Sequence, residues 1–174
     1  ITYVQNWALR LGTRYQRYKI DSVHPVHQSA TSVVLFATDV VDDAPVALKL
    51  MKNYDEFARE IITRFGDTSV DACVTNVIGW HVPKGEDTPL KHDKKRDDVT
   101  ELGFYPDKPY VLVMERGSTS LFHELQTQRL AGYDRDQIKN IFTDAVEKVQ
   151  VLHNFGLIHS DLKPRNVLRM NNGT

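Results

Sequence analysis

The chain has 174 residues, of which 41% are hydrophobic and 26% charged, and its formal net charge is -1 at pH 7. These values are ordinary for a globular protein, and the charge offers no broad basic surface for nucleic acid or an anionic membrane. Because no apolar run is of membrane-spanning length and no secretory pattern opens the sequence, we expect no nucleic-acid partner and no membrane partner. The single cysteine, Cys73, excludes an internal disulfide and favours an intracellular, cytoplasmic location.

The N-terminal half predicts a small antiparallel sheet. Residues 1–19 mix aromatic and basic side chains, which could suggest RNA, although a short lead-in that packs on a following sheet is the simpler interpretation. Strands are predicted at about 20–27, 33–40 and 46–51, because turn-rich segments separate these apolar runs. We expect the strands to form an antiparallel meander. The third strand carries a lone lysine, Lys49, which must reach water with its amino group or pair with an anion.

An amphipathic helix is predicted for Tyr54–Phe65, with Gly66 as its C-terminal cap. Residues at four-residue spacing mark its buried face: Phe57, Ile61 and Phe65. Glu60 lies beside that face, and a solvated pair with Arg64 is one reading of this carboxylate.

A further strand is predicted for 74–82, and the sheet resumes at 110–114. Between them, 83–109 is a long polar segment whose charges nearly cancel, and we interpret it as an inserted, solvated loop, with a docking role as the alternative.

Helices dominate the C-terminal part of the prediction. A short helix is expected at 121–129, and a long one follows Asp134 as N-cap and ends near Asn154, with Gly156 beyond it. One face of the long helix is apolar, and we expect it to lack partners within this chain: Ile138, Ile141, Phe142, Ala145, Val149 and Leu152. His153 and His159 lie close in sequence, but no third ligand has spacing that suits zinc.

A polar loop, 159–168, leads into a short apolar run. It contains an acid, a lysine and an amide at fixed spacing, namely Asp161, Lys163 and Asn166. This combination suits phosphoryl transfer, in which the protein mainly positions groups and neutralises charge. Asp161 would accept the proton of an attacking hydroxyl, and Lys163 would lie against the transferring phosphate. Asn166 would offer a neutral oxygen to Mg²⁺, a hard ion that prefers oxygen ligands. A polar turn before a strand is the plainer alternative.

The run His-Ser-Asp-Leu-Lys-Pro-Arg-Asn-Val-Leu at 159–168 resembles the catalytic loop of the eukaryotic-type protein kinase family. The lysine after Asp-Leu resembles the serine/threonine branch. The resemblance implies an α+β, protein-kinase-like fold, with an antiparallel β-rich N-lobe that carries one helix, followed by the first helices and the catalytic loop of a helical C-lobe.

The resemblance also implies a division of the chain. After the lead-in, the N-lobe spans 20–114 with its inserted loop, the hinge spans 115–117, and a partial C-lobe spans 118–174. Because the chain starts without methionine and ends on an Asn-Gly turn signal without a return strand, we expect a fragment truncated after the catalytic loop. The family's Asp-Phe-Gly acid would lie beyond it, and the fragment alone is expected to be inactive.

By this resemblance, Lys49 belongs to the Val-Ala-x-Lys strand whose lysine holds the α and β phosphates of ATP. Its carboxylate partner is then Glu60, with Glu56 as the second choice.

The resemblance assigns further residues to the nucleotide. Val34 would form an apolar roof over adenine, Ala47 would line the same pocket, and Met114 would guard the space behind the base. Glu115 and Gly117 would flank the hinge donor and acceptor atoms, with an edge strand and a turn as the alternative reading of this segment.

Two departures from the family pattern are expected to matter. His27, Ser29 and Ser32 replace glycines in the phosphate-covering turn, so we expect looser phosphate binding in which serine hydroxyls partly substitute as donors. Ser160 replaces the arginine that commonly receives an activation-loop phosphate, and serine cannot make that bidentate contact.

The predicted function is protein serine/threonine kinase activity, with ATP and Mg²⁺ as cofactors and a protein hydroxyl as acceptor. A nucleotide-binding pseudokinase or scaffold and a kinase-like small-molecule phosphotransferase are the alternatives.

Overall fold

A computed structural model describes residues 14–15, 17–22, 24–65, 73–83, 85, 105–128 and 134–170. Several predicted features lie outside these ranges: most of the lead-in 1–19, the Gly66 cap, most of the insertion 83–109, Arg129, and the turn at 171–174. In the part of the chain that is described, no helix has both the length and the apolar character needed to cross a bilayer.

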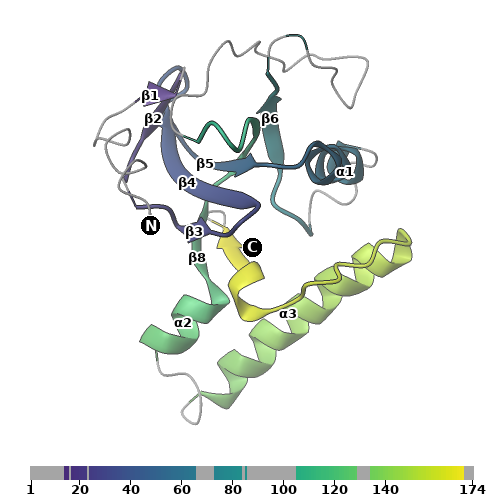
Figure 1. Cartoon of the computed structure of the whole chain (residues 1–174). Helices are drawn as coiled ribbons and strands as arrows, with labels where there is room; N and C mark the ends of the chain where they lie inside the picture. The colour runs from purple at the N-terminus through teal and green to yellow at the C-terminus, as the bar shows by residue number, and fades with distance from the viewer. Residues whose placement is uncertain are drawn as a thin grey trace. The chain divides into compact units, whose positions relative to one another are not determined.

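The chain divides into two compact units, and most of their helices and strands are labelled in Figure 1. The first unit comprises Ile1–Asp67 and Asn76–Glu115, and the second comprises Thr68–Thr75 and Arg116–Thr174. An antiparallel sheet with one helix forms the first unit, whereas the described elements of the second are mainly helical. The predicted α+β class is therefore confirmed.

The first unit is built on an antiparallel sheet in the strand order β1-β2-β4-β5-β7-β6, with β3 paired to β4. The strands are β1 (Arg14–Tyr15), β2 (Tyr18–Ile20), β3 (His27–Gln28), β4 (Ser32–Asp39), β5 (Ala44–Met51), β6 (Val77–His81) and β7 (Tyr110–Glu115). The predicted meander is confirmed in β2, β4 and β5, which pair in that order.

The prediction of one strand over 20–27 was wrong. That stretch supplies the end of β2 and the start of β3, and both strands pair with β4, through Ile20 opposite Ala37 and His27 opposite Val34. The segment from Ile20 to His27 is longer than the segment of β4 between their partners, Ala37 and Val34. The extra residues therefore leave the sheet between β2 and β3. Pro25 lacks an N–H for the ladder, which makes it a natural place for this interruption.

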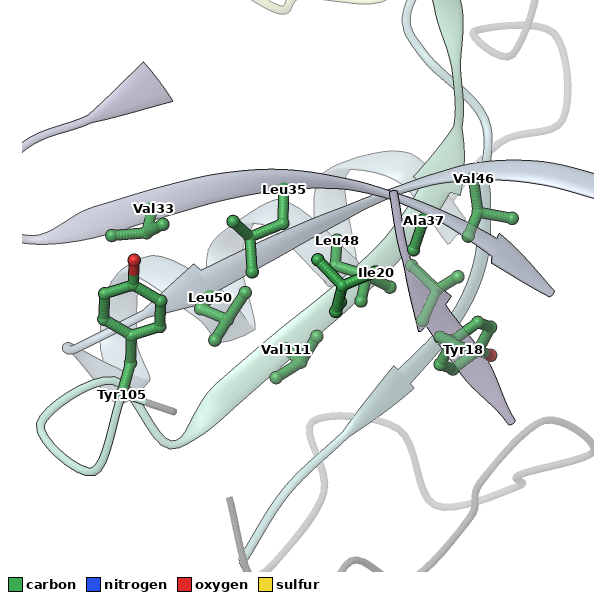
Figure 2. Packing of buried hydrophobic residues seen from close by; sticks show 11 residues of the cluster. Tyr18, Ile20, Val33, Leu35, Ala37, Val46, Leu48, Leu50, Tyr105 and Val111 are labelled. Carbon is green, nitrogen blue, oxygen red and sulfur yellow. The ribbon is translucent and has the colours of Figure 1, made fainter. Parts of the chain in front are cut away.

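One face of the sheet carries a closed apolar core, shown in Figure 2. Every second residue of β4 points into it, and the burial of β4 alternates accordingly. Side chains from β2, β4, β5 and β7 converge in this core, together with Tyr105, which precedes β7: Tyr18, Ile20, Val33, Leu35, Ala37, Val46, Leu48, Leu50, Tyr105, Val111 and Val113. Burying each large aliphatic side chain contributes about 1.5–3 kcal/mol, which fixes the register of the strands.

The opposite face packs against helix α1 (Tyr54–Phe65), whose bounds agree with the prediction. Phe57 and Ile61 are fully buried there, and the Phe57 ring stacks on Tyr110 with 5.3 Å between centroids. Acidic residues in the first turn and Arg64 in the last turn complement the helix dipole. The helix therefore presents a fixed set of side chains to β5 and β7.

An ion pair between Arg17 and Asp39 lies at the C-terminal end of β4. Asp39 is 2% exposed and accepts hydrogen bonds from Arg17 Nε at 2.8 Å. Burial by itself would raise the pKa of Asp39, but the hydrogen bonds from Arg17 and from backbone N–H groups, together with the Arg17 charge, outweigh it and the pKa is lowered. The charged form of Asp39 is thus part of the folded structure.

The second unit contains helices α2 (Leu121–Thr127) and α3 (Arg135–Asn154) and a two-stranded sheet of β8 (Gly117–Ser120) and β9 (Leu168–Met170). Asp134 caps α3 as predicted, since its Oδ1 accepts from the Gln137 N–H at 2.8 Å. Gly156 follows the helix with φ of +71°, a left-handed conformation that favours glycine. The sequence did not predict β8.

The apolar face of α3 is partly covered in the part of the chain that the structure describes. Of the residues predicted for that face, Leu152 is buried, whereas Phe142 is 70% exposed. Val146, on the same helix, is 54% exposed. Four further residues of the predicted face are half-buried: Ile138, Ile141, Ala145 and Val149. The expectation that this face lacks partners within the chain therefore holds at Phe142 and was wrong at Leu152.

Candidate nucleotide and catalytic site

In the first unit, residues predicted to contact a nucleotide lie on one face of the sheet. Val34 is the cross-strand partner of Lys49, and Ala47 is the partner of Met114. Partners in a ladder share a face, as do residues two apart such as Ala47 and Lys49, so all of these side chains project to the same side. Ala47 and Met114 are buried there, while Val34 stays half-buried.

The Lys49 ammonium forms an ion pair with Glu60 Oε1, as the sequence predicted for these two residues. Glu60 reaches the lysine because the buried residues Phe57 and Ile61 fix the face of α1 that meets the sheet. Both charged side chains are about three-quarters buried, at 23% and 25% exposure. Glu56, the second choice, instead accepts a hydrogen bond from the Asn53 amide at 3.1 Å.

Glu60 has a second cationic neighbour. Its Oε2 lies 3.4 Å from Arg64 Nη2, while Arg64 Nη1 lies 3.4 Å from the Met114 sulfur. Burial lowers the pKa of Arg64, and the Glu60 charge opposes that shift. Glu60 therefore pairs with both Lys49 and Arg64, but the expectation of a solvated pair with Arg64 was wrong, because the two side chains are only 25% and 19% exposed. The Met114 contact could not be predicted.

The turn that joins β3 to β4 is closed by its own serines. The Ser29 N–H donates to the Ser32 carbonyl at 2.8 Å, and the Ser32 N–H donates to Ser29 Oγ at 3.0 Å. The two hydroxyl oxygens lie 3.2 Å apart. Neither serine has a positive φ, so the replacement of glycine causes no backbone strain here. These N–H groups bond within the turn, where the glycine-rich pattern would direct such donors at phosphate.

The end of β7 carries Glu115, whose side chain is exposed and whose N–H donates to the Asn76 carbonyl at 3.0 Å. The boundary between the two units follows this residue, within the segment 115–117 that the sequence predicts as the hinge.

Gly117 opens β8 in the second unit and is buried. A Cβ at this position would lie 3.2 Å from the Leu168 Cβ and 3.3 Å from the Arg169 carbonyl oxygen. Close approach of β8 to β9 therefore requires glycine, a packing role that the sequence did not indicate.

The polar loop of the second unit brings its acid, lysine and amide together. Lys163 Nζ lies 2.7 Å from Asp161 Oδ2, and the Asn166 amide nitrogen donates to the same oxygen at 2.9 Å. That nitrogen also donates to the Asp161 backbone carbonyl at 2.8 Å. The hydrogen bond from Lys163, with a smaller contribution from Asn166, lowers the pKa of the Asp161 carboxyl. Asp161 is thus ionised at neutral pH and remains largely exposed.

The backbone of this loop is tightly turned. Ser160 adopts a φ of +55°, which is uncommon outside glycine, and the Asp161 N–H donates to the His159 carbonyl at 2.7 Å. A 3₁₀ turn over Pro164–Asn166 follows, with the proline at its first position, where its missing N–H costs nothing. These features set the directions of the Asp161 and Asn166 side chains.

Contacts with α2 hold the loop and the strand β9 that follows it. The Arg165 guanidinium lies over the Phe122 ring, 3.8 Å from its centroid, and the Leu121 N–H donates to the Val167 carbonyl at 2.9 Å. Arg169 pairs with the buried carboxylate of Glu124 at 3.0 Å. No local pattern signals these contacts, because they join segments far apart in the chain.

The donor set of the loop fits a magnesium ion better than a softer metal. The Asn166 amide nitrogen is occupied by Asp161, so its carbonyl oxygen is the atom left to accept or to ligate. An amide oxygen held in place by the loop matches the oxygen preference of Mg²⁺.

The comparisons with known proteins agree with this geometry. Residues 98–174 match the protein kinase domain family. A stretch of 64 residues, 37% of the chain, is 33% identical to cyclin-dependent kinase 12 of Caenorhabditis elegans and covers 9% of that protein. The chain thus corresponds to a small part of this relative's length.

The resemblance to the protein kinase family is confirmed over residues 98–174, and the fold is protein-kinase-like. Both matches are therefore with kinases, which are phosphotransferases. The family match begins after Lys49 and Glu60, so their proposed roles are supported only by the geometry of the first unit.

Proposed function

We propose that the chain forms part of a protein serine/threonine kinase domain that transfers the γ-phosphoryl group of ATP to a protein hydroxyl. The observation that carries this proposal is the hydrogen-bonded cluster of Asp161, Lys163 and Asn166, which lies within the segment that matches the protein kinase domain family. In this proposal, residues 20–114 form the N-lobe with its insertion, 115–117 the hinge and 118–174 part of the C-lobe.

Each residue of the loop has a role that its contacts support. The Asp161 carboxylate is ionised and exposed, so it can orient the acceptor hydroxyl and take its proton as the new O–P bond forms. Lys163, held by Asp161, places a positive charge beside the transferring group. The Asn166 amide is oriented by Asp161, which leaves its oxygen for Mg²⁺.

The sheet of the first unit supplies the proposed nucleotide contacts. Lys49 would bind the α and β phosphates, with Glu60 fixing its position. Val34, Ala47 and Met114 share the face of Lys49 and would contact the base. Bound with Mg²⁺, ATP supplies the transferable phosphoryl group and a leaving group whose charge the metal neutralises.

The acceptor class is tested with the full-length protein, γ-labelled ATP, Mg²⁺ and a mixture of protein acceptors. Phosphoserine or phosphothreonine in acid hydrolysates is the expected result, whereas label on tyrosine alone would contradict the serine/threonine assignment. Labelling of an added sugar or aminoglycoside, with none on protein, would instead identify a small-molecule phosphotransferase.

The serine turn favours a second candidate, a nucleotide-binding pseudokinase or scaffold. Because Ser29 and Ser32 satisfy one another, fewer donors remain for phosphate than a glycine-rich turn would provide. Nucleotide binding without any labelled product, on proteins or on small molecules, would support this candidate. Replacing both serines by glycine tests whether their mutual hydrogen bonds weaken phosphate binding. If they do, the variant should bind ATP more tightly than the wild type.

A further inference from the structure

The Lys49–Glu60 pair is part of a larger charged cluster. Glu60 uses one oxygen for Lys49 and the other for Arg64, and the remaining arm of the arginine contacts the Met114 sulfur. One carboxylate thus lies between two cations. These residues all belong to the first unit.

Arg64 differs from an ordinary solvated helix cation. Its side chain is 19% exposed, although most i,i+4 ion pairs on helices lie in water. An arginine stays protonated even when its pKa is lowered, so this position holds a permanent positive charge in partly buried surroundings. A charge there is poorly screened and acts strongly on an anion bound nearby.

We infer that Arg64 is a positioning and specificity residue that makes this site select polyphosphate nucleotides. By neutralising part of the Glu60 charge, Arg64 leaves Lys49 with positive charge to offer to phosphate. A Lys49–Glu60 pair alone would be neutral and would attract an anion less. This inference rests on the proposed nucleotide site and assigns Arg64 no contact with the nucleotide.

The test measures ATP and adenosine affinities of the full-length protein by titration calorimetry, without Mg²⁺, for the wild type and for Arg64→Met. Methionine keeps much of the apolar volume beside Met114 and removes the charge. We expect ATP affinity to fall about tenfold, the order of magnitude for one partly buried charge near an anion, and adenosine affinity to change less than about twofold.

Matched variants separate charge from structure. Arg59→Met removes an exposed cation from the same helix and should leave both affinities unchanged. Arg64→Lys keeps the charge and should retain ATP affinity within about threefold of the wild type. If Arg64→Met does not fold, Arg64→Gln replaces it, since glutamine removes the charge but can still donate to Glu60.

The outcomes distinguish this inference from the proposed function. If Arg64→Met leaves the ratio of ATP to adenosine affinity unchanged, or binds ATP more tightly, the inferred role of Arg64 is wrong. The proposed nucleotide site is not affected by either result. An equal loss of ATP affinity in Arg64→Lys also overturns the inferred role, because charge would then not be the cause. A wild type that binds neither ATP nor adenosine contradicts the proposed function itself.

Discussion

Replacing Gly117 by alanine tests whether packing alone requires glycine where β8 meets β9. The new Cβ would lie 3.2 Å from the Leu168 Cβ and 3.3 Å from the Arg169 carbonyl oxygen. Carbon atoms prefer about 3.5–4.0 Å, so the strands must separate by about 0.3–0.8 Å. Neither neighbouring atom is the mobile end of a side chain, so the backbone has to move. Overpacking of this kind costs about 1–3 kcal/mol, and we expect Tm to fall by about 2–12 °C.

The assay is thermal unfolding followed by circular dichroism, with amide hydrogen exchange at Leu168–Met170 as a local readout. Gly156→Ala serves as the control, because Gly156 has a φ of +71° and a Cβ added there would meet no atom within 4 Å. That variant should lose about 1 kcal/mol through backbone strain without faster exchange in β9. A Gly117→Ala protein with wild-type Tm and wild-type exchange in β9 would refute the packing role of this glycine.

The remaining predictions concern the ion pair, the sheet core and the catalytic loop. The pKa of Asp39 is lowered on folding from its ordinary 3.8, so its stabilisation is present above that value and is lost as the pH falls through the folded-state pKa. Asp39→Asn should therefore cost about 2–3 kcal/mol at pH 7 in urea unfolding and progressively less as the pH falls below 3.8, and a pH-independent difference would contradict this. Phe57→Ala should cost about 3–5 kcal/mol, against under about 1 kcal/mol for the 53% exposed Ile62→Ala, and equal losses would be inconsistent with the packing of α1. Asn166→Ala should raise the pKa of Asp161 in a carbon-detected NMR titration, because it removes one of the hydrogen bonds that lower it; an unchanged pKa would argue against this contact.

Local patterns in the sequence predicted structural features well where the residues involved are close together in the chain. Asp161, Lys163 and Asn166 lie within one loop, so a single turn of the backbone brings their side chains into contact. The bounds of α1 and the N-cap of α3 were also correct, because apolar periodicity and capping chemistry are local signals. The Lys49–Glu60 pair was predicted from the family resemblance, since nothing in the strand itself identifies the partner.

The features that the sequence missed depend on distant segments or on side-chain detail. Strand β8 consists of small and polar residues and pairs with β9, which lies far along the chain, so it has no apolar alternation to detect. The contact of Arg64 with Met114 joins residues 50 positions apart. The mutual hydrogen bonds of Ser29 and Ser32 depend on the hairpin geometry, which composition does not specify.

The most direct test compares the wild type with Asp161→Asn in the full-length protein, measuring both ATP affinity and the rate of phosphoryl transfer in a single turnover. Asparagine keeps the size of the side chain but cannot accept the hydroxyl proton. We predict ATP affinity within about threefold of the wild type and transfer slower by roughly 10²- to 10⁴-fold. Transfer at the wild-type rate in the variant would contradict the role of Asp161 and, with it, the assignment of this loop as the catalytic loop.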